Sequence, residues 1–230
     1  MSPQATVDGD PWAAARAAML AAIDEDFGAT AAQTGLSAMP PAVRAAIAAV
    51  PRHRFVPEAS RPLAYANRPL PIGHGQTISQ PFIVALMTAL LELRPQDRVL
   101  EIGSGCGYQA AVLAQLAARV HSVEIVPALA ERAARTLAEL GIATVTVHAG
   151  DGHRGWPEGA PYDKIIATAA ASELPPAWIE QLAPGGRLVA PLGAAEGVQT
   201  LVLLRKDGAG RVQQDSRLAV RFVPLTGGGR

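Results

Sequence analysis

Short apolar runs alternate with helical patterns through most of the chain after residue 98. Residues 98–102, 120–125, 144–148 and 164–168 read as strands, and residues 109–118, 128–140 and 175–182 read as helices. This alternation is typical of parallel strands that are joined by right-handed crossovers, with helices on both faces of the sheet. It predicts a doubly wound α/β domain.

The pattern changes at the end of the chain. Residues 187–191, 200–204 and 218–223 read as three more strands, which makes seven in all. No helix-length pattern separates the last two, only a turn around residues 206–210, and such a connection favours an antiparallel hairpin. We therefore expect a mostly parallel, seven-stranded Rossmann-like sheet that ends in an antiparallel hairpin.

The first eighty residues have a different character. Residues 11–23 are rich in alanine and favour a helix by propensity, and a second helix is expected from Pro40-Pro41 to Val50, so an N-terminal helical cap precedes the sheet. Residues 59–80 read as a loop because proline and glycine recur there. A strongly apolar helix then begins at Pro81 and ends before residues 94–97.

Composition narrows the classes of partner. The chain has 230 residues, 20 Lys and Arg against 20 Asp and Glu, and one cysteine, Cys106. This balance gives no reason to expect a nucleic-acid or membrane partner, and one thiol excludes a disulfide framework. No cluster has metal-ligand spacing, so no metal is expected. The acidic N-terminus is unlike a secretory signal, and no apolar run is long enough to span a membrane, so a cytoplasmic protein is expected.

A glycine-rich turn follows the first strand of the alternating region. It reads Glu101-Ile102-Gly103-Ser104-Gly105-Cys106-Gly107-Tyr108 and stands where doubly wound sheets bind nucleotides. The dinucleotide fingerprint needs a glycine at position 108, which is Tyr108 here. Glu101 at the strand tip suits a cationic amino-acid group such as that of S-adenosylmethionine, rather than a pyrophosphate. A tight turn without any ligand remains open.

Two further carboxylates follow neighbouring strands. Glu124 ends the second strand, where a carboxylate can accept hydrogen bonds from ribose hydroxyls. Asp151, between Gly150 and Gly152, follows the third strand and can accept from an adenine amino group. A solvated strand end and a plain Asp-Gly turn are the alternative interpretations.

Several segments resemble the protein-L-isoaspartate O-methyltransferase family, and the resemblance runs from about residue 39 to residue 226. The segments are VPRHRFVP (50–57), GQTISQP (75–81), VLEIGSGCGYQ (99–109), GDGHRGW (150–156), the start and end of the fourth strand (162–163 and 168–170), LAPGGRLVAPLG (182–193) and RFVPLT (221–226). The segment that contains Thr77 and Ser79 is the most specific, because class I methyltransferases in general lack it.

The resemblance implies an activity and a site. The activity is methyl transfer from S-adenosylmethionine to the free α-carboxylate of L-isoaspartyl residues in damaged proteins, which initiates repair and leaves S-adenosylhomocysteine. Ser79 would be the active-site residue, and Gln76 and Thr77 would position the substrate. The implied cofactor contacts are Ile78, Ser79, Glu101, Gly103, Ser104, Gly105, Gly107, Glu124, Ile125, Asp151, Gly152 and Thr226. Residues 1–35 would be a helical extension, 36–80 a cap with the acceptor loop, and 81–230 the cofactor core.

The chemistry asks for positioning rather than for a base. A free α-carboxyl has an ordinary pKa of about 3.3–3.7, so the nucleophile is already ionised at neutral pH. Ser79 is therefore expected to orient the acceptor by hydrogen bonding. His53, His74, Arg52 and Arg54 are interpreted as surface residues. Cys106, Trp156 and Trp178 are interpreted as packing residues.

Three other functions remain in view at this point. The first is an enzyme of the same fold that esterifies a different peptide carboxylate, because the loop constrains the carboxylate better than the rest of the substrate. A cofactor-binding protein without turnover is disfavoured by the intact loop from Gln76 to Ser79. A nicotinamide oxidoreductase is disfavoured by Tyr108. A monomer is expected.

Overall fold

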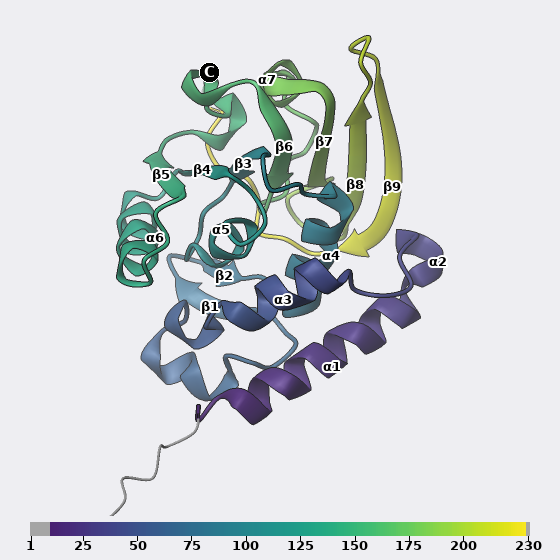
Figure 1. The fold of residues 1–230 in the computed structure, drawn as a ribbon. Coiled ribbons are helices and arrows are strands. Elements are labelled where there is room, and N and C mark those ends of the chain that lie inside the picture. The colour runs from purple at the N-terminus through teal and green to yellow at the C-terminus, as the bar shows by residue number, and fades with distance from the viewer. Residues whose placement is uncertain (1–9, 229–230) are drawn as a thin grey trace, which may run out of the picture.

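A seven-stranded sheet lies at the centre of the protein, with helices on both faces (Figure 1). The computed structural model describes residues 10–228, so the first nine residues of the expected N-terminal extension lie outside the described part. The strands are β1 (Leu70–Gly73), β2 (Gln76–Ile78), β3 (Arg98–Ile102), β4 (Arg119–Glu124), β5 (Val145–Ala149), β6 (Tyr162–Ala167), β7 (Leu182–Leu192), β8 (Gln199–Lys206) and β9 (Val212–Val220). The α-helices are α1 (Ala13–Ala29), α2 (Ala31–Thr34), α3 (Pro41–Ala49), α4 (Pro81–Leu91), α5 (Tyr108–Leu113), α6 (Pro127–Glu139) and α7 (Pro176–Gln181). The 3-10 turns are η1 (Arg52–Arg54), η2 (Glu58–Leu63), η3 (Gly152–Arg154) and η4 (Pro157–Gly159).

The order of the strands confirms the predicted fold class. The sheet runs β5-β4-β3-β6-β7-β8-β9, in which the first five strands are parallel and β8 and β9 are antiparallel to their neighbours. The chain leaves β3 toward β4 on one side and returns to β6 on the other. The carboxyl ends of β3, β4 and β6 therefore meet at a switch point, which is where ligands bind in open α/β sheets.

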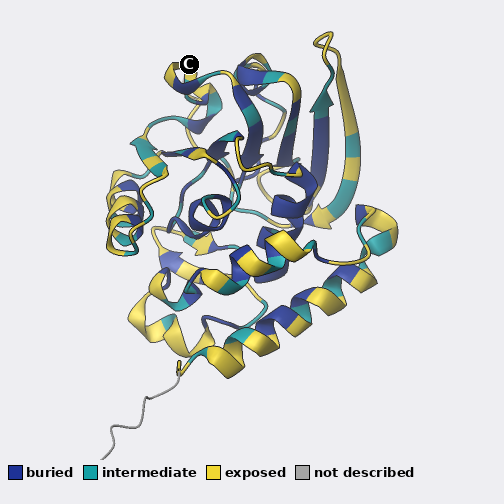
Figure 2. Cartoon of the chain, in the orientation of Figure 1, coloured by how far each residue is buried: buried dark blue, intermediate teal, exposed yellow. Residues whose placement is uncertain are grey.

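Both faces of the sheet are buried at its centre, which explains why its central strands contain short apolar runs instead of a strict alternation of apolar and polar residues. Val99 belongs to the hydrophobic cluster on one face, and its neighbour Leu100 belongs to the cluster on the other. Figure 2 shows this buried centre, with exposed surface on the outer sides of α1, α6 and β9.

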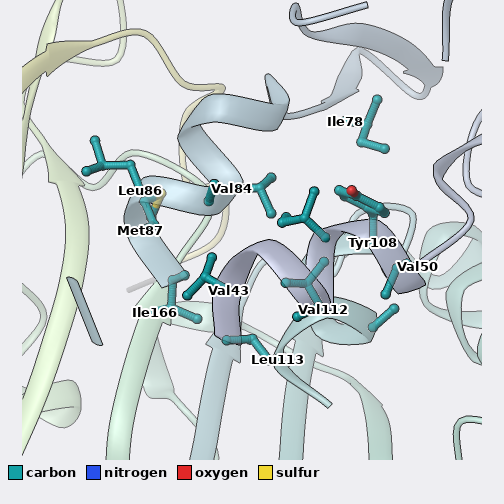
Figure 3. Close-up of a cluster of buried hydrophobic side chains, with 14 of the residues drawn as sticks. Val43, Val50, Ile78, Val84, Leu86, Met87, Tyr108, Val112, Leu113 and Ile166 are labelled. Carbon is teal, nitrogen blue, oxygen red and sulfur yellow. The ribbon is translucent and has the colours of Figure 1, made fainter. Parts of the chain in front are cut away.

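The N-terminal helices join the larger of these clusters. Phe27 of α1 packs edge-on against Phe82 of α4, with ring centroids 5.5 Å apart. Val43 of α3 lies beside Val112 of α5 in the same buried group (Figure 3). The two predicted helices are thus present and packed on the core, and the first continues to Ala29.

Two predictions about secondary structure were wrong. Residues 59–80 are not simply a loop, because η2 is followed by an antiparallel hairpin of β1 and β2 whose turn, Gly73-His74-Gly75, has positive φ values of 89°, 54° and 70°. The last strand spans Val212–Val220 rather than residues 218–223. The first residues of this strand are largely exposed and polar, so the hydrophobic pattern does not indicate where the strand begins. None of the helices within residues 10–228 is long and apolar enough to cross a membrane.

Candidate active site

A cavity opens at the switch point, and we call it the glycine-turn cavity. The turn after β3, the end of β4, the loop from β2 to α4, the residues after β6 and the segment after β9 form its walls. The predicted site residues that line it are Gln76, Thr77, Ile78, Ser79, Gly103, Ser104, Gly105, Glu124, Ile125, Gly152 and Thr226. Segments that are far apart in the sequence are thus brought together here.

Close backbone approach fixes the glycine turn. Gly103 has a φ of 92°, and a Cβ added to it would lie 2.6 Å from Oγ1 of Thr168. The Thr168 hydroxyl also hydrogen-bonds the carbonyl oxygens of Ile102 and Gly103. The turn and the residue after β6 are consequently locked together, so this wall of the cavity is preformed.

Glu124 stabilises the opposite wall of the cavity. Its carboxylate accepts hydrogen bonds from the backbone N–H of Gly105, at 2.8 Å, and of Val126, at 3.0 Å. The side chain is almost fully buried yet lines the cavity. One carboxylate therefore holds two turns in place and still presents lone pairs to a ligand hydroxyl.

Glu101 lies behind the cavity wall rather than in it. Its side chain is fully buried, accepts a short hydrogen bond from Ser122, and is linked through Ser122 to Ser104. Its Oε1 has no hydrogen-bond partner within residues 10–228. Burial raises the pKa of Glu101 to about 8, although donation from Ser122 opposes the rise.

The pKa of Glu101 leads to a prediction about stability. In the unfolded chain the Glu101 carboxyl has an ordinary pKa near 4.5, and in the folded protein its pKa is about 8. The contribution of the neutral Glu101 side chain to stability is therefore complete below pH 4.5 and is lost as the pH rises toward 8. We expect the unfolding free energy to fall between pH 5 and pH 9 by a few kcal/mol more in the unaltered protein than in Glu101→Gln, at about 1.4 kcal/mol per pKa unit. Denaturant unfolding at both pH values measures this. Parallel curves for the two proteins would contradict it, and Glu131→Gln, on the exposed side of α6, is the control.

Two other predicted contacts do not line the cavity. Gly107, at φ 88°, is the residue before α5, and a Cβ there would lie 3.2 Å from that of Ala133 on α6, so it serves helix packing. The Asp151 carboxylate accepts hydrogen bonds from the backbone N–H groups of His153 and Gly228. Burial would raise the pKa of Asp151, but the donations from Gly228 and His153 outweigh burial and lower it.

Arg52 is the residue beside the site that sequence reasoning missed, because its expected surface position was wrong. The side chain is fully buried, and its guanidinium lies 4.8 Å from the centre of the Tyr108 ring. Its Nε donates to the carbonyl oxygen of Ala64 and its Nη2 to that of Ser79, both at 2.8 Å. Burial lowers its pKa, although Tyr108 opposes this. Arg52 therefore tethers the backbone of the predicted active-site residue to the core.

The remaining candidates have structural roles. The Trp178 indole is fully buried and donates to the carbonyl oxygen of Gly152 at 2.8 Å, which holds that wall of the cavity. Cys106 is buried, and burial raises the pKa of its thiol to about 11, so a reactive thiolate is not formed near neutral pH. Among residues 10–228, no group of three or more His, Cys, Asp or Glu side chains is placed to hold a metal ion.

Comparison with known proteins gives one consistent result. A family model described as protein-L-isoaspartate(D-aspartate) O-methyltransferase matches residues 31–230. The protein-L-isoaspartate O-methyltransferase 2 of Syntrophobacter fumaroxidans is 53% identical over 219 residues, which cover 95% of this chain and 89% of that protein. Protein-L-isoaspartate O-methyltransferase 1 of Cupriavidus necator is 53% identical over 222 residues, which cover 96% and 86%.

Solved structures agree with these relatives. A protein-L-isoaspartate O-methyltransferase superposes with a TM-score of 0.80 at 30% identity, over 92% of this chain and 66% of that chain. A Plasmodium falciparum protein described by the same activity, solved in complex with S-adenosyl-L-homocysteine, shares the fold with a TM-score of 0.74 at 23% identity, over 92% and 98% of the two chains.

Proposed function

The chain belongs to the protein-L-isoaspartate(D-aspartate) O-methyltransferase family, and we propose that it methylates the free α-carboxylate of L-isoaspartyl residues in the glycine-turn cavity. It is an S-adenosylmethionine-dependent enzyme whose reaction starts the repair of damaged proteins. The site assignment rests on one observation, which is that the Gln76–Ser79 segment and the glycine turn line the same cavity.

The residues of the cavity fit S-adenosylmethionine. Glu124 presents a carboxylate for ribose hydroxyls, and Ile125 offers an apolar surface for adenine. Glu101 lies behind the cavity wall, and its Oε1, which has no hydrogen-bond partner within residues 10–228, supports its proposed role as an acceptor for the cationic amino-acid end. When bound, this cofactor supplies a methyl carbon that its sulfonium makes electrophilic.

The protein's own part in the reaction is to orient the acceptor and to exclude water. The Ser79 hydroxyl and the side chains of Gln76 and Thr77 are the hydrogen-bonding groups that the Gln76–Ser79 segment offers to hold a carboxylate. No general base is needed, because the acceptor carboxylate is already ionised. The β1–β2 hairpin is held over the cavity by Arg132 of α6, which donates to the carbonyl oxygen of Ile72 at 2.7 Å. This cover lowers the exposure of reacting charges to water.

Glu124→Ala is expected to weaken cofactor binding much more than it slows turnover at saturating cofactor. The variant loses a charged acceptor for the ribose and releases the N–H of Gly105. Hydrogen bonds to charged groups contribute about 1.5–3 kcal/mol, so the dissociation constant for S-adenosylhomocysteine should rise roughly 10- to 150-fold. Calorimetric titration measures this. Glu131→Ala is the matched control, and equal affinities for the two variants would refute the role of Glu124.

A paired-peptide assay tests the proposed activity. The protein is given labelled S-adenosylmethionine and either an isoaspartyl peptide or its aspartyl twin. Methyl uptake by the isoaspartyl peptide alone is expected. Equal uptake by both peptides, or uptake by the aspartyl twin alone, would favour an enzyme for another carboxylate. Cofactor binding without uptake by either would favour a binding protein without turnover.

Some finer expectations are part of the same proposal. Residues 36–80 act as cap and acceptor loop, residues 81–230 act as the cofactor core, and residues 1–35 are an extension. The protein works as a monomer in the cytoplasm, without nucleic-acid or membrane partners. The balanced charge supports the part of this proposal that concerns partners.

A further inference from the structure

A second hollow adjoins the glycine-turn cavity, and we call it the α1 groove. Its lining is Asp26, Pro69, Thr77, Ser79, Gln80, Phe82, Ile83, Thr168 and residues 218–223. Thr77, Ser79, Thr168 and Val223 line both hollows. The α1 groove is therefore continuous with the place proposed for the acceptor carboxylate. Residues of α1 and of the segment at the end of β9 both line it.

Asp26 brings a carboxylate from the N-terminal extension into this groove. Its Oδ2 accepts hydrogen bonds from Nδ2 of Asn67, at 2.8 Å, and from Nε2 of Gln80, at 3.4 Å. Asn67 is itself fixed, because its Oδ1 accepts from the backbone N–H of Phe82 at 3.0 Å. The carboxylate is thus held in one position, and Oδ1 of Asp26 accepts no hydrogen bond from residues 10–228.

The Asp26 carboxylate forms no ion pair within the described residues. The ion pairs among residues 10–228 include neither Asp26 nor Arg221, the other charged residue of the groove. Asp26 also begins the last turn of α1, which has no basic residue, and it directly follows Asp24 and Glu25. The partial negative charge of a helix C-terminus favours cations, so this end of α1 attracts a positive group.

We propose that Asp26, held by Asn67 and Gln80, is a subsite for a lysine or arginine side chain that flanks the isoaspartyl residue of the substrate. The inference rests on the proposed function and names a class of its substrates. Gln80 directly follows Ser79, so a side chain at Asp26 belongs to a residue close to the acceptor carboxylate. Arg221 lines the same groove and repels a cation. A basic side chain is therefore favoured only at the flanking position whose side chain reaches Asp26.

The test uses isoaspartyl peptides of one scaffold that carry a single lysine, or glutamine in its place, at each of the two positions on either side of the isoaspartate. The readout is the ratio of kcat/KM for the lysine peptide to that for the glutamine peptide. We expect a ratio of about five at a position on one side only, mainly through KM, as for an ion pair that is still partly solvated. The ratio should fall toward one in Asp26→Asn and as ionic strength rises in the unaltered protein.

Glu25→Gln is the matched control, because it removes the same charge from an exposed position of the same helical turn and should leave the ratio unchanged. If Asp26→Asn does not fold, the salt dependence of the kcat/KM ratio in the unaltered protein still tests the inference. A ratio near one at all four positions would overturn the inference, and so would a preference that survives in Asp26→Asn. Methylation of the glutamine peptides without a lysine preference would leave the proposed function standing, whereas no methylation of any isoaspartyl peptide would count against that function itself.

Discussion

Arg52→Met lowers the rate of methyl transfer about a hundredfold, the loss expected when a reacting group is displaced by about 1 Å. The reason is the tether from the guanidinium to the backbone carbonyl of Ser79, which methionine cannot replace. Stability should change less than activity. Two carbonyl oxygens lose their donor at a cost of about 1–3 kcal/mol each. The variant recovers the cost of burying a cation whose Nη1 has no hydrogen-bond partner within residues 10–228.

The measurement is kcat together with the dissociation constant for S-adenosylhomocysteine and the free energy of unfolding. Arg54→Met is the matched control, because Arg54 is two residues away, partly exposed and paired with Glu139 at 2.9 Å. Exposed pairs of this kind contribute at most about 1 kcal/mol, so the control should keep its activity. If Arg52→Met loses stability but keeps full turnover in the folded protein, then Arg52 does not position Ser79.

Ser79→Ala should reduce kcat roughly 10- to 150-fold, because a hydrogen bond to a charged group contributes about 1.5–3 kcal/mol. Ser79 lines both the glycine-turn cavity and the α1 groove, which is where we propose that the acceptor carboxylate meets the methyl group. The affinity for S-adenosylhomocysteine should change much less than kcat, since we propose that Glu124 and the glycine turn hold the cofactor.

Single-turnover methylation of an isoaspartyl peptide measures this effect without interference from product release. Ser37→Ala is a suitable control, because Ser37 is exposed and lies outside both hollows. Unchanged turnover in Ser79→Ala would show that the hydroxyl does not orient the acceptor, and a loss of cofactor affinity equal to the loss of kcat would assign it to cofactor binding.

The sheet could be predicted from the sequence because its strands satisfy a local rule. Val99, Leu100 and Ile102 are buried on the two faces of the sheet, so the strand appears as an apolar run that only Glu101 interrupts. Glu124 could be predicted as a cavity residue for a similar reason, because an acidic residue at the end of the second strand of such a sheet recurs at the ligand crevice. The glycine turn and its position relative to Ser79 followed from the fold and the family resemblance together.

What sequence reasoning missed depends on tertiary contacts. The β1–β2 hairpin contains Pro71 and two glycines, which are typical of loops, so its strands do not show in the sequence pattern. Arg132, on a helix far away in the sequence, helps to hold the hairpin. Arg52 reads as a solvated charge because the Tyr108 ring and the carbonyl groups that receive it come from other segments. Asp26 lies outside the part of the chain that resembles the family, so no pattern marked it.

The most direct test of the account is a crystal structure of the protein with S-adenosylhomocysteine and an isoaspartyl peptide. We expect the adenosine beside residues 103–107, with its ribose on Glu124, and the free α-carboxylate within hydrogen-bonding distance of the Ser79 hydroxyl. Adenosine bound anywhere else, or a peptide carboxylate remote from Ser79, would contradict the central claim that this cavity brings the two reactants together.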